Sequence, residues 1–158
     1  MKKRIMVLGG KLFTNYAYNN GEYTIEKNNI ISKLKEKFII DDFSNNALTS
    51  INALNYINTF INERNYNSCI LQLGEMDNDS NVFKDNLQAI IDSLKAINVK
   101  PILVGLSENN CENKKNQYII DELAEKNKVA LINGRNSINQ YIANTDTQIR
   151  RTIIKLSN

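Results

Sequence analysis

Three short apolar segments of the chain are each followed by polar residues that could bind or react with a ligand. Lys11 follows the first segment, directly after Gly10, Ser44 follows the second, and Glu75 and Asp77 follow the third. A lysine can bind an anion, or act as a base where desolvation lowers its pKa. A serine beside a base can act as a nucleophile, and carboxylates accept hydrogen bonds or ligate hard cations. These residues are therefore the first candidates for a functional site.

The chain contains no histidine, and this absence limits the chemistry available to these residues. It excludes Ser-His and Cys-His nucleophilic mechanisms, imidazole general bases and the common histidine-containing zinc sites. Ser44 could then act as a nucleophile only with a lysine base, and we expect Lys11 to be its neighbour across adjacent strand ends. The simpler interpretation, which we favour, is a turn or cap residue at position 44 and a solvated loop lysine at position 11.

Five acidic residues near expected strand ends could together hold Mg²⁺ or Ca²⁺, namely Asp41, Asp42, Glu75, Asp77 and Glu108. Their spacing matches no known ligand signature. We therefore favour strand-end acids and turn formers, with Asp77 holding its loop through hydrogen bonds to backbone N–H groups. The sequence predicts no bound metal and no cofactor.

Other residues have both a functional and a structural interpretation. Cys111 could react only with a lowered pKa, and we expect an ordinary loop cysteine. Asp146 fits a first-turn acid that the helix dipole favours. Tyr16, Tyr18 and Tyr23 could stack on a sugar or a base, or pack against a neighbouring helix.

Apolar segments alternate regularly with segments of helical periodicity. The expected strands are 4–8, 38–40, 69–73, 101–106 and 129–132. The expected helices are 24–37, 48–64, 81–97 with Ser80 as a cap, 113–126, a short piece over 137–143, and a final helix opened by a capping box at 145–148. Residues 15–21 read as a loop. Such alternation predicts an α/β fold, a three-layer α/β/α sandwich with a five-stranded, mainly parallel sheet.

Ligands of open α/β sheets bind beyond the carboxyl ends of the strands. The expected strand ends converge on one edge and bring together the residues that we predict to bind a ligand. These residues are Gly10, Lys11, Ser44, Gly74, Glu75 and Asp77.

The order of elements and a few short motifs resemble the SGNH, or GDSL-like, hydrolases. That family places Gly-Asp-Ser, with its nucleophilic serine, where this chain has Gly9-Gly10-Lys11. Ser44 aligns with the glycine whose N–H helps to bind the oxyanion. The family's Gly-x-Asn-Asp block reads Gly74-Glu75-Met76-Asp77 here, so the oxyanion-binding asparagine is replaced by methionine. The nearest counterpart of Asp-x-x-His is 146–149, which ends in isoleucine.

The resemblance therefore implies the hydrolase fold without its catalytic triad. Loss of a triad member generally leaves a rate only about 10³ to 10⁴ times the uncatalysed rate. The family's oxyanion-donating residues are replaced in this chain as well. We expect a non-catalytic module that binds a small polar or carbohydrate ligand or a protein partner. The alternatives are an acyl or acetyl esterase with a histidine-free mechanism centred on Lys11, Ser44, Glu75 and Asp77, and a plain interaction protein with an empty cleft.

Two related α/β folds fit less well. The chain lacks the Gly-x-Gly-x-x-Gly and Walker A loops of nucleotide-binding folds. A flavodoxin-like domain would need a phosphate-binding loop after the first strand, and residues 11–15 supply little of it.

Length and charge set further limits. With 158 residues, 1–158 is expected to form a single domain. The 20 basic and 17 acidic residues are interspersed along the sequence, so we expect no nucleic-acid partner. The sequence has no apolar run long enough to span a membrane, and we expect no membrane association. Two cysteines without an export signal fit a cytoplasmic protein, which could form a homodimer.

Overall fold

The computed structural model describes residues 1–14, 16–19, 22–25, 30–106, 113–132 and 138–157. Its centre is a five-stranded sheet in which every neighbouring pair is parallel, in the order β4-β1-β5-β6-β7. The strands are β1 (Arg4–Gly9), β4 (Ile39–Asp42), β5 (Ser68–Gln72), β6 (Lys100–Val104) and β7 (Ala130–Ile132). The predicted α/β fold with a central β5 is confirmed.

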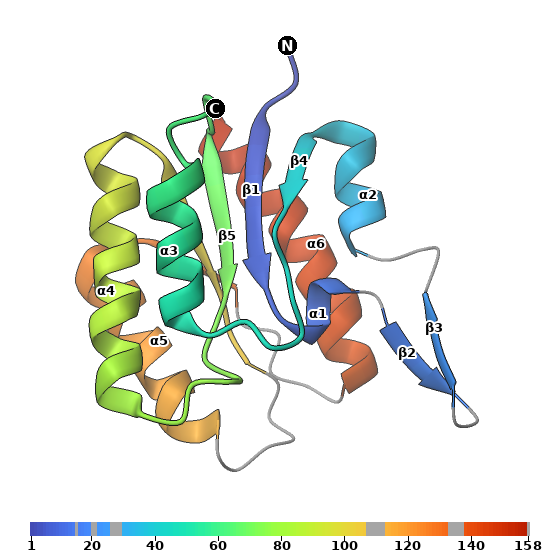
Figure 1. Cartoon of the computed structure of the whole chain (residues 1–158). Coiled ribbons are helices and arrows are strands. Elements are labelled where there is room, and N and C mark those ends of the chain that lie inside the picture. The colour runs from blue at the N-terminus through green and yellow to red at the C-terminus, as the bar shows by residue number, and fades with distance from the viewer. Residues whose placement is uncertain (15, 20–21, 26–29, 107–112, 133–137, 158) are drawn as a thin grey trace.

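Helices cover both faces of this sheet (Figure 1). They are α1 (Lys11–Thr14), α2 (Ile30–Lys37), α3 (Ser50–Phe60), α4 (Ser80–Ala96), α5 (Asn113–Asn127) and α6 (Ile138–Ser157). Side chains from α3, α4 and α5 pack on one face, and those from α1, α2 and α6 pack on the other. The molecule is therefore a three-layer sandwich.

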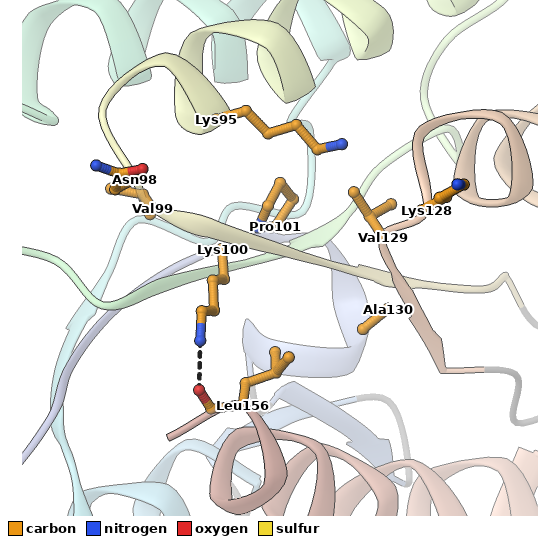
Figure 2. A pocket seen from close by; sticks show the side chains of 9 residues that line it. All are labelled: Lys95, Asn98, Val99, Lys100, Pro101, Lys128, Val129, Ala130 and Leu156. Atoms are coloured by element: carbon orange, nitrogen blue, oxygen red, sulfur yellow. Dashed lines mark hydrogen bonds between the residues drawn. The ribbon is translucent and has the colours of Figure 1, made fainter. Parts of the chain in front are cut away.

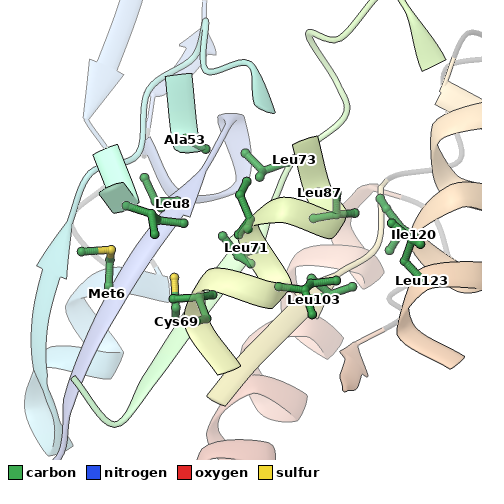
Figure 3. Close-up of a cluster of buried hydrophobic side chains, with 14 of the residues drawn as sticks. Met6, Leu8, Ala53, Cys69, Leu71, Leu73, Leu87, Leu103, Ile120 and Leu123 are labelled. Atoms are coloured by element: carbon green, nitrogen blue, oxygen red, sulfur yellow. The ribbon is translucent and has the colours of Figure 1, made fainter. Parts of the chain in front are cut away.

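The inner strands β1, β5 and β6 are mostly apolar because both of their faces are buried. Met6, Leu8 and Leu71 point into the layer formed by α3, α4 and α5, as Figure 3 shows, whereas Ile5 and Val7 point into the opposite layer. This alternation follows from the two-residue repeat of a strand. Continuous apolar runs thus fill two cores at once.

The segment after α1 differs from the prediction. Residues 15–21 were expected to be a loop and 24–37 a helix, but β2 (Tyr16–Asn19) and β3 (Glu22–Ile25) form an antiparallel hairpin. In Figure 1 this hairpin projects beside the main body, and α2 begins only at Ile30. Tyrosine, threonine and isoleucine favour strands, and this local preference prevails over the helical spacing that the sequence showed further on.

Three helix starts also differ from expectation. Asp79, and not Ser80, caps α4, because its Oδ1 accepts hydrogen bonds from the N–H groups of Asn81 and Val82 at 3.0 and 3.1 Å. Thr49 caps α3 in the same way through Asn52 N–H. The C-terminal segment is one continuous helix, so the expected capping box at 145–148 lies inside α6 and opens no new helix.

Within the described residues, no helix combines the length and the apolar character that crossing a bilayer would require.

Candidate functional site

The carboxyl ends of β1, β4 and β5 lie at one edge of the sheet, at the bottom of Figure 1. Backbone bonds extend the pairing of β1 and β4 past the last strand residue: Phe43 N–H donates to Val7 O at 2.8 Å and Asn45 N–H to Gly9 O at 3.0 Å. Ser44, between them, is thereby held beside the turn after β1. The predicted convergence of these strand ends is present.

Two hydrogen bonds, one buried and one partly buried, join the turn after β1 to the loop after β5. Gly10 N–H donates to Gln72 Oε1 at 2.9 Å, and Gln72 Nε2 donates to Glu75 Oε1. The carboxyl carbon of Glu75 lies 3.8 Å from the position that a Cβ on Gly10 would occupy. Gln72, only 2% exposed, therefore holds a carboxylate directly over Gly10. The second oxygen of Glu75 has no partner among the described residues and can accept from a ligand.

Ser44 is held by two hydrogen bonds that use its backbone and its side chain. Its Oγ accepts from Gly9 N–H at 3.2 Å, and its hydroxyl proton has no acceptor among the described residues. Its own N–H donates to Asp42 Oδ1 at 3.0 Å. The backbone N–H at position 44 is therefore already occupied by a carboxylate.

Lys11 is the first residue of α1 and its side chain is exposed. Within the described part of the chain, its ammonium group forms no hydrogen bond or ion pair, including with Ser44. The expected Ser44–Lys11 pair is thus not formed in this structure. Lys11 instead presents an exposed cation at the rim of the strand-end edge.

Asp77 faces away from this rim and binds the start of α3. Its carboxylate accepts from Ser50 N–H at 3.0 and 3.2 Å and from Ser50 Oγ at 2.6 Å. Asn86 of α4 donates to the same hydroxyl at 3.0 Å. A negative charge at a helix N-terminus also interacts favourably with the helix dipole. The role of Asp77 in this geometry is to fix the loop after β5, as its structural interpretation predicted.

Gly74 lies in the same loop with φ +113°, a conformation that favours glycine. A Cβ there would lie 3.0 Å from Phe83 Cζ and 3.3 Å from Asn116 Cβ. Asn116 Nδ2 donates to Gly74 O at 2.8 Å and to Asp77 O at 2.9 Å, and Asn116 Oδ1 accepts from Ser80 Oγ at 2.9 Å. Gly74 is therefore a buried structural position, and Asn116 ties its loop to α4 and α5.

The acidic residues proposed as a cation site are dispersed. Asp41 accepts from Arg4 Nη1 at 2.9 Å and from Tyr66 OH at 2.7 Å. Partial burial raises the pKa of Asp41, but these hydrogen bonds and the positive charge of Arg4 outweigh it and leave the pKa below its ordinary value. Among the described residues, no three acidic or cysteine side chains come together to hold a metal ion.

Several candidates lie outside the described residues: Glu108, Cys111 and the loop 133–135. The side chains of Tyr16, Tyr18, Tyr23 and Asp146 lie outside them as well. Cys69 is fully buried in β5, and burial raises the pKa of its thiol, so it is an inert core residue.

Two residues that organise the site were not identified from the sequence. Gln72 did carry a signal, because it is the one strongly polar residue in the apolar run 69–73. A buried polar side chain at a strand end needs a partner and so marks a constrained position. Asn116 carried none, because it lies in a helix that is polar along much of its sequence.

No protein-family model and no curated protein sequence matches the chain. Several solved structures do match the chain. A psychrotrophic esterase from Pseudoalteromonas sp. covers 99% of this chain and 100% of its own, with a TM-score of 0.72 and 17% identity. A GDSL-like lipase from Bacteroides thetaiotaomicron covers 97% and 88%, with a TM-score of 0.71 and 14% identity. An SGNH-hydrolase family esterase, AlinE4, covers 84% and 76%, with a TM-score of 0.66 and 20% identity.

The chain has the SGNH-hydrolase fold. Identities of this size establish the fold and leave the activity open. The resemblance found in the sequence is thus confirmed for the architecture, and the residues at the strand ends have to be considered on their own chemistry.

The sequence resemblance aligns position 11 with the family's nucleophile. It aligns positions 44 and 76 with the two residues that donate to the oxyanion. Here these positions hold the lysine, the serine whose N–H bonds to Asp42, and Met76, whose side chain is 43% exposed and has no hydrogen to donate. Gly10 N–H is also engaged, with Gln72. Among the described residues of this edge, the N–H groups of Gly10 and Ser44 are already hydrogen-bonded, while Glu75 offers an acceptor and Lys11 a cation.

Proposed function

We propose that this chain is a non-catalytic SGNH-hydrolase-fold domain, a single unit over 1–158, that binds a small polar ligand of the carbohydrate class at its strand-end edge. The observation that carries the proposal is the hydrogen bond from Ser44 N–H to Asp42 Oδ1 at 3.0 Å. It places a negative charge where an acyl-transfer enzyme needs a donor.

This hydrogen bond has a large effect on the rate of acyl transfer that the edge could support. Removing one oxyanion donor typically costs about 10² to 10³ in rate, and a carboxylate in its place adds repulsion of the developing oxyanion. A lysine at the nucleophile position offers no hydroxyl to acylate, and the chain has no histidine to deprotonate one. Classical ester hydrolysis is therefore not supported at this edge.

The groups that remain suit a ligand with several hydroxyls. Among the described residues, Glu75 has a carboxylate oxygen and Ser44 a hydroxyl proton without a partner, and Lys11 adds an exposed cation. Sugars offer donors and acceptors at spacings that such a mixed set can satisfy. Because Gln72 and Gly10 hold Glu75 in place, the acceptor is positioned before the ligand arrives.

Thermal unfolding with monosaccharides and short oligosaccharides tests the proposal. A ligand specific for the folded state adds about 2.7 kcal/mol of stability at a hundredfold its Kd, so the midpoint rises measurably. We expect Glu75→Gln and Lys11→Ala to reduce that rise. The matched variants Asp85→Asn and Lys114→Ala, which change exposed residues elsewhere, leave it intact. A panel without any shift, or a shift that survives both site variants, contradicts the proposal.

An esterase with an altered mechanism is the second candidate, and the esterases among the structural neighbours favour it. Its test is turnover of p-nitrophenyl acetate by the purified chain. Turnover well above buffer that is lost in Ser44→Ala or Lys11→Ala would establish an enzyme and defeat the non-catalytic proposal. Turnover that survives both changes would point to another site or to a contaminant.

A protein partner, including a second copy of the chain, is the third occupant to consider. Sedimentation velocity over a range of concentrations separates a homodimer from a monomer. A dimer that Lys11→Glu dissociates would place the strand-end edge in an interface, and sugar binding would then be absent in the dimer.

A further inference from the structure

The edge of the sheet opposite the candidate site is strongly basic. The strands begin at this edge, and each helix from α2 to α6 ends there, at the top of Figure 1. The basic edge consists of the cations in the last helical turns, the connecting loops and the first strand residues: Lys2, Lys3, Arg4, Lys35, Lys37, Arg64, Lys95, Lys100, Lys126, Lys128 and Lys155.

These eleven residues are more than half of the 20 basic residues in the chain. Only four of the 17 acidic residues, Glu36, Asp41, Glu63 and Glu125, lie in the same segments. The basic edge thus has a surplus of seven positive charges, although the whole chain has a net charge of only +3. The remaining sequence is correspondingly acidic.

Helix dipoles explain part of this surplus but not all of it. A helix C-terminus carries about half a negative charge, so five of them contribute roughly −2.5 and favour nearby lysines. Three lysines are used in this way: Lys100 Nζ donates to Leu156 O at 2.5 Å, Lys2 Nζ donates to Glu36 O at 3.1 Å, and Lys95 Nζ donates to Asn127 O. The surplus of positive charge exceeds the sum of the dipoles, so a positive potential remains.

Two neighbouring hollows lie in the basic edge. One, of about 280 Å³, lies between the ends of α4, α5 and α6 and is lined by Lys95, Lys100 and Lys128, as Figure 2 shows. The other, of about 460 Å³, is lined by Lys2, Lys3, Arg4 and Arg64 among others. The carbonyl of Asn67, which lines the second hollow, accepts from the N–H of Lys100, which lines the first, at 3.1 Å.

Exposed aliphatic side chains lie among these cations. Ile39, at the start of β4, is 37% exposed and lines the larger hollow, and Ile97, at the end of α4, is 41% exposed. The aromatic residues Phe38 and Tyr66 beside them are buried, so they cannot stack on unpaired bases. Both arginines face Asp41, at 2.9 and 4.0 Å, so the cations of the basic edge without an acidic partner among the described residues are lysines.

We propose that the basic edge docks peripherally on an anionic lipid bilayer. Lysines are attracted to an anionic membrane surface, and aliphatic side chains strengthen the binding by entering the interface. Single-stranded nucleic acid is favoured less because no exposed aromatic platform accompanies the lysines. The absence of a membrane span does not bear on this, since such docking needs none. The expectation of no membrane association considered only a spanning segment, and the lysines of the basic edge are scattered in the sequence and meet only in the fold.

Cosedimentation with vesicles tests the proposal on the full chain. We expect binding to phosphatidylcholine vesicles that contain about one-third phosphatidylserine, no binding to phosphatidylcholine alone, and loss of binding at about 0.5 M salt. Lys3→Glu with Lys37→Glu should weaken the partition coefficient at least about tenfold. The matched control, Lys114→Glu with Lys115→Glu at the start of α5, makes the same charge change at the other edge and should have little effect.

Two further measurements separate the bilayer from other polyanions. Ile39→Thr keeps the branched side chain at the start of β4 but removes apolar surface, and it should weaken vesicle binding several-fold. Fluorescence anisotropy with duplex DNA and single-stranded RNA tests nucleic acid as the alternative partner. Tighter binding to either nucleic acid than to acidic vesicles overturns the proposal. An equal loss of vesicle binding in the Lys114→Glu, Lys115→Glu control also overturns it, and so does a chain that binds neither vesicles nor nucleic acid. Far-UV circular dichroism of each variant shows that it is folded. None of these outcomes depends on the sugar-binding proposal.

Discussion

The carboxylate of Asp77 accepts the backbone N–H and the hydroxyl of Ser50 together, the hydroxyl at 2.6 Å, and so joins the loop after β5 to the first turn of α3. This pair is partly buried and separated by 27 residues in sequence. It shows that an acidic residue of a motif associated with catalysis in hydrolases serves here to hold two elements together.

Asp77→Ala should therefore destabilise the fold by about 1–3 kcal/mol, the range for hydrogen bonds to a charged group. Urea unfolding measures the change. A double-mutant cycle with Ser50→Ala isolates the pair, and we expect a coupling energy of at least about 0.5 kcal/mol. Asp85→Ala, at an exposed position of α4, serves as the control. Additive effects of the two changes would show that the pair does not stabilise the protein.

Gly74→Ala and Gly10→Ala form a second, contrasting pair. At Gly74, φ is +113° and a Cβ would lie 3.0 Å from Phe83, so alanine should cost about 1–3 kcal/mol. At Gly10, the nearest atom would be Gln72 Oε1 at 3.4 Å, an ordinary contact, so stability should change by less than about 1 kcal/mol. Thermal unfolding of both variants is the measurement. Equal losses at the two sites would contradict this interpretation.

Asn116→Asp tests the buried amide that links α5 to the loop after β5. The carboxylate that replaces the amide faces the carbonyl oxygens of Gly74 and Asp77, so its protonated form is favoured and its pKa in the folded state is raised. The variant should then be least unstable in acid and lose stability as the pH rises through that pKa. Chemical unfolding from pH 4 to 8, compared with Asn116→Ala, checks this. Parallel pH profiles for the two variants would refute it.

Asp41 provides the converse pH dependence. Its pKa is lowered in the folded state, so its charge stabilises the fold above the unfolded pKa of about 3.9, and that contribution is lost as the pH falls through the folded value. Asp41→Asn should cost about 1–3 kcal/mol at neutral pH and progressively less below about pH 4. Urea unfolding against pH gives the difference, with Asp85→Asn as the control. A difference that stays constant into acid would exclude the charge as its cause.

The hydrogen bond between Tyr66 and Asp41 also predicts how stability changes at alkaline pH. Burial, together with the hydrogen bond to Asp41, raises the pKa of Tyr66 above its ordinary value. Its phenol therefore stays protonated in the folded protein after exposed tyrosines have ionised, and its contribution to stability is lost as the pH rises past about 10. Absorbance titration of Tyr66→Phe should lack the last-ionising group that the unchanged protein shows. An unchanged titration curve would contradict the assignment.

Much of the fold could be predicted because strand periodicity and burial agree along most of the chain. The run 69–73 is apolar because both faces of β5 are covered, and this alone indicated a central parallel strand. The hairpin β2–β3 was missed because a short two-stranded unit leaves little periodic pattern. The continuity of α6 was missed because the residues from Thr145 to Gln148 have the form of a capping box, a local pattern that also occurs inside a helix here.

The site was harder to predict than the fold. Sequence spacing placed Glu75 and Gly10 at the same edge, but it could not show that Gln72 joins them. Nor could it show that Ser44 N–H bonds to Asp42 two residues earlier, because side-chain direction decides that contact. The gathering of lysines at the opposite edge was also hidden, since its members extend from position 2 to position 155.

The loop after β5 is tied to three separate elements: to the turn after β1 through Gln72, to α3 through Ser50, and to α5 through Asn116. Local opening of this loop and the binding of a ligand to the Glu75 carboxylate are therefore linked equilibria. A molecule that engages this carboxylate reduces the population of opened loop, and slower amide hydrogen exchange then extends to α3 and α5, neither of which the molecule needs to touch.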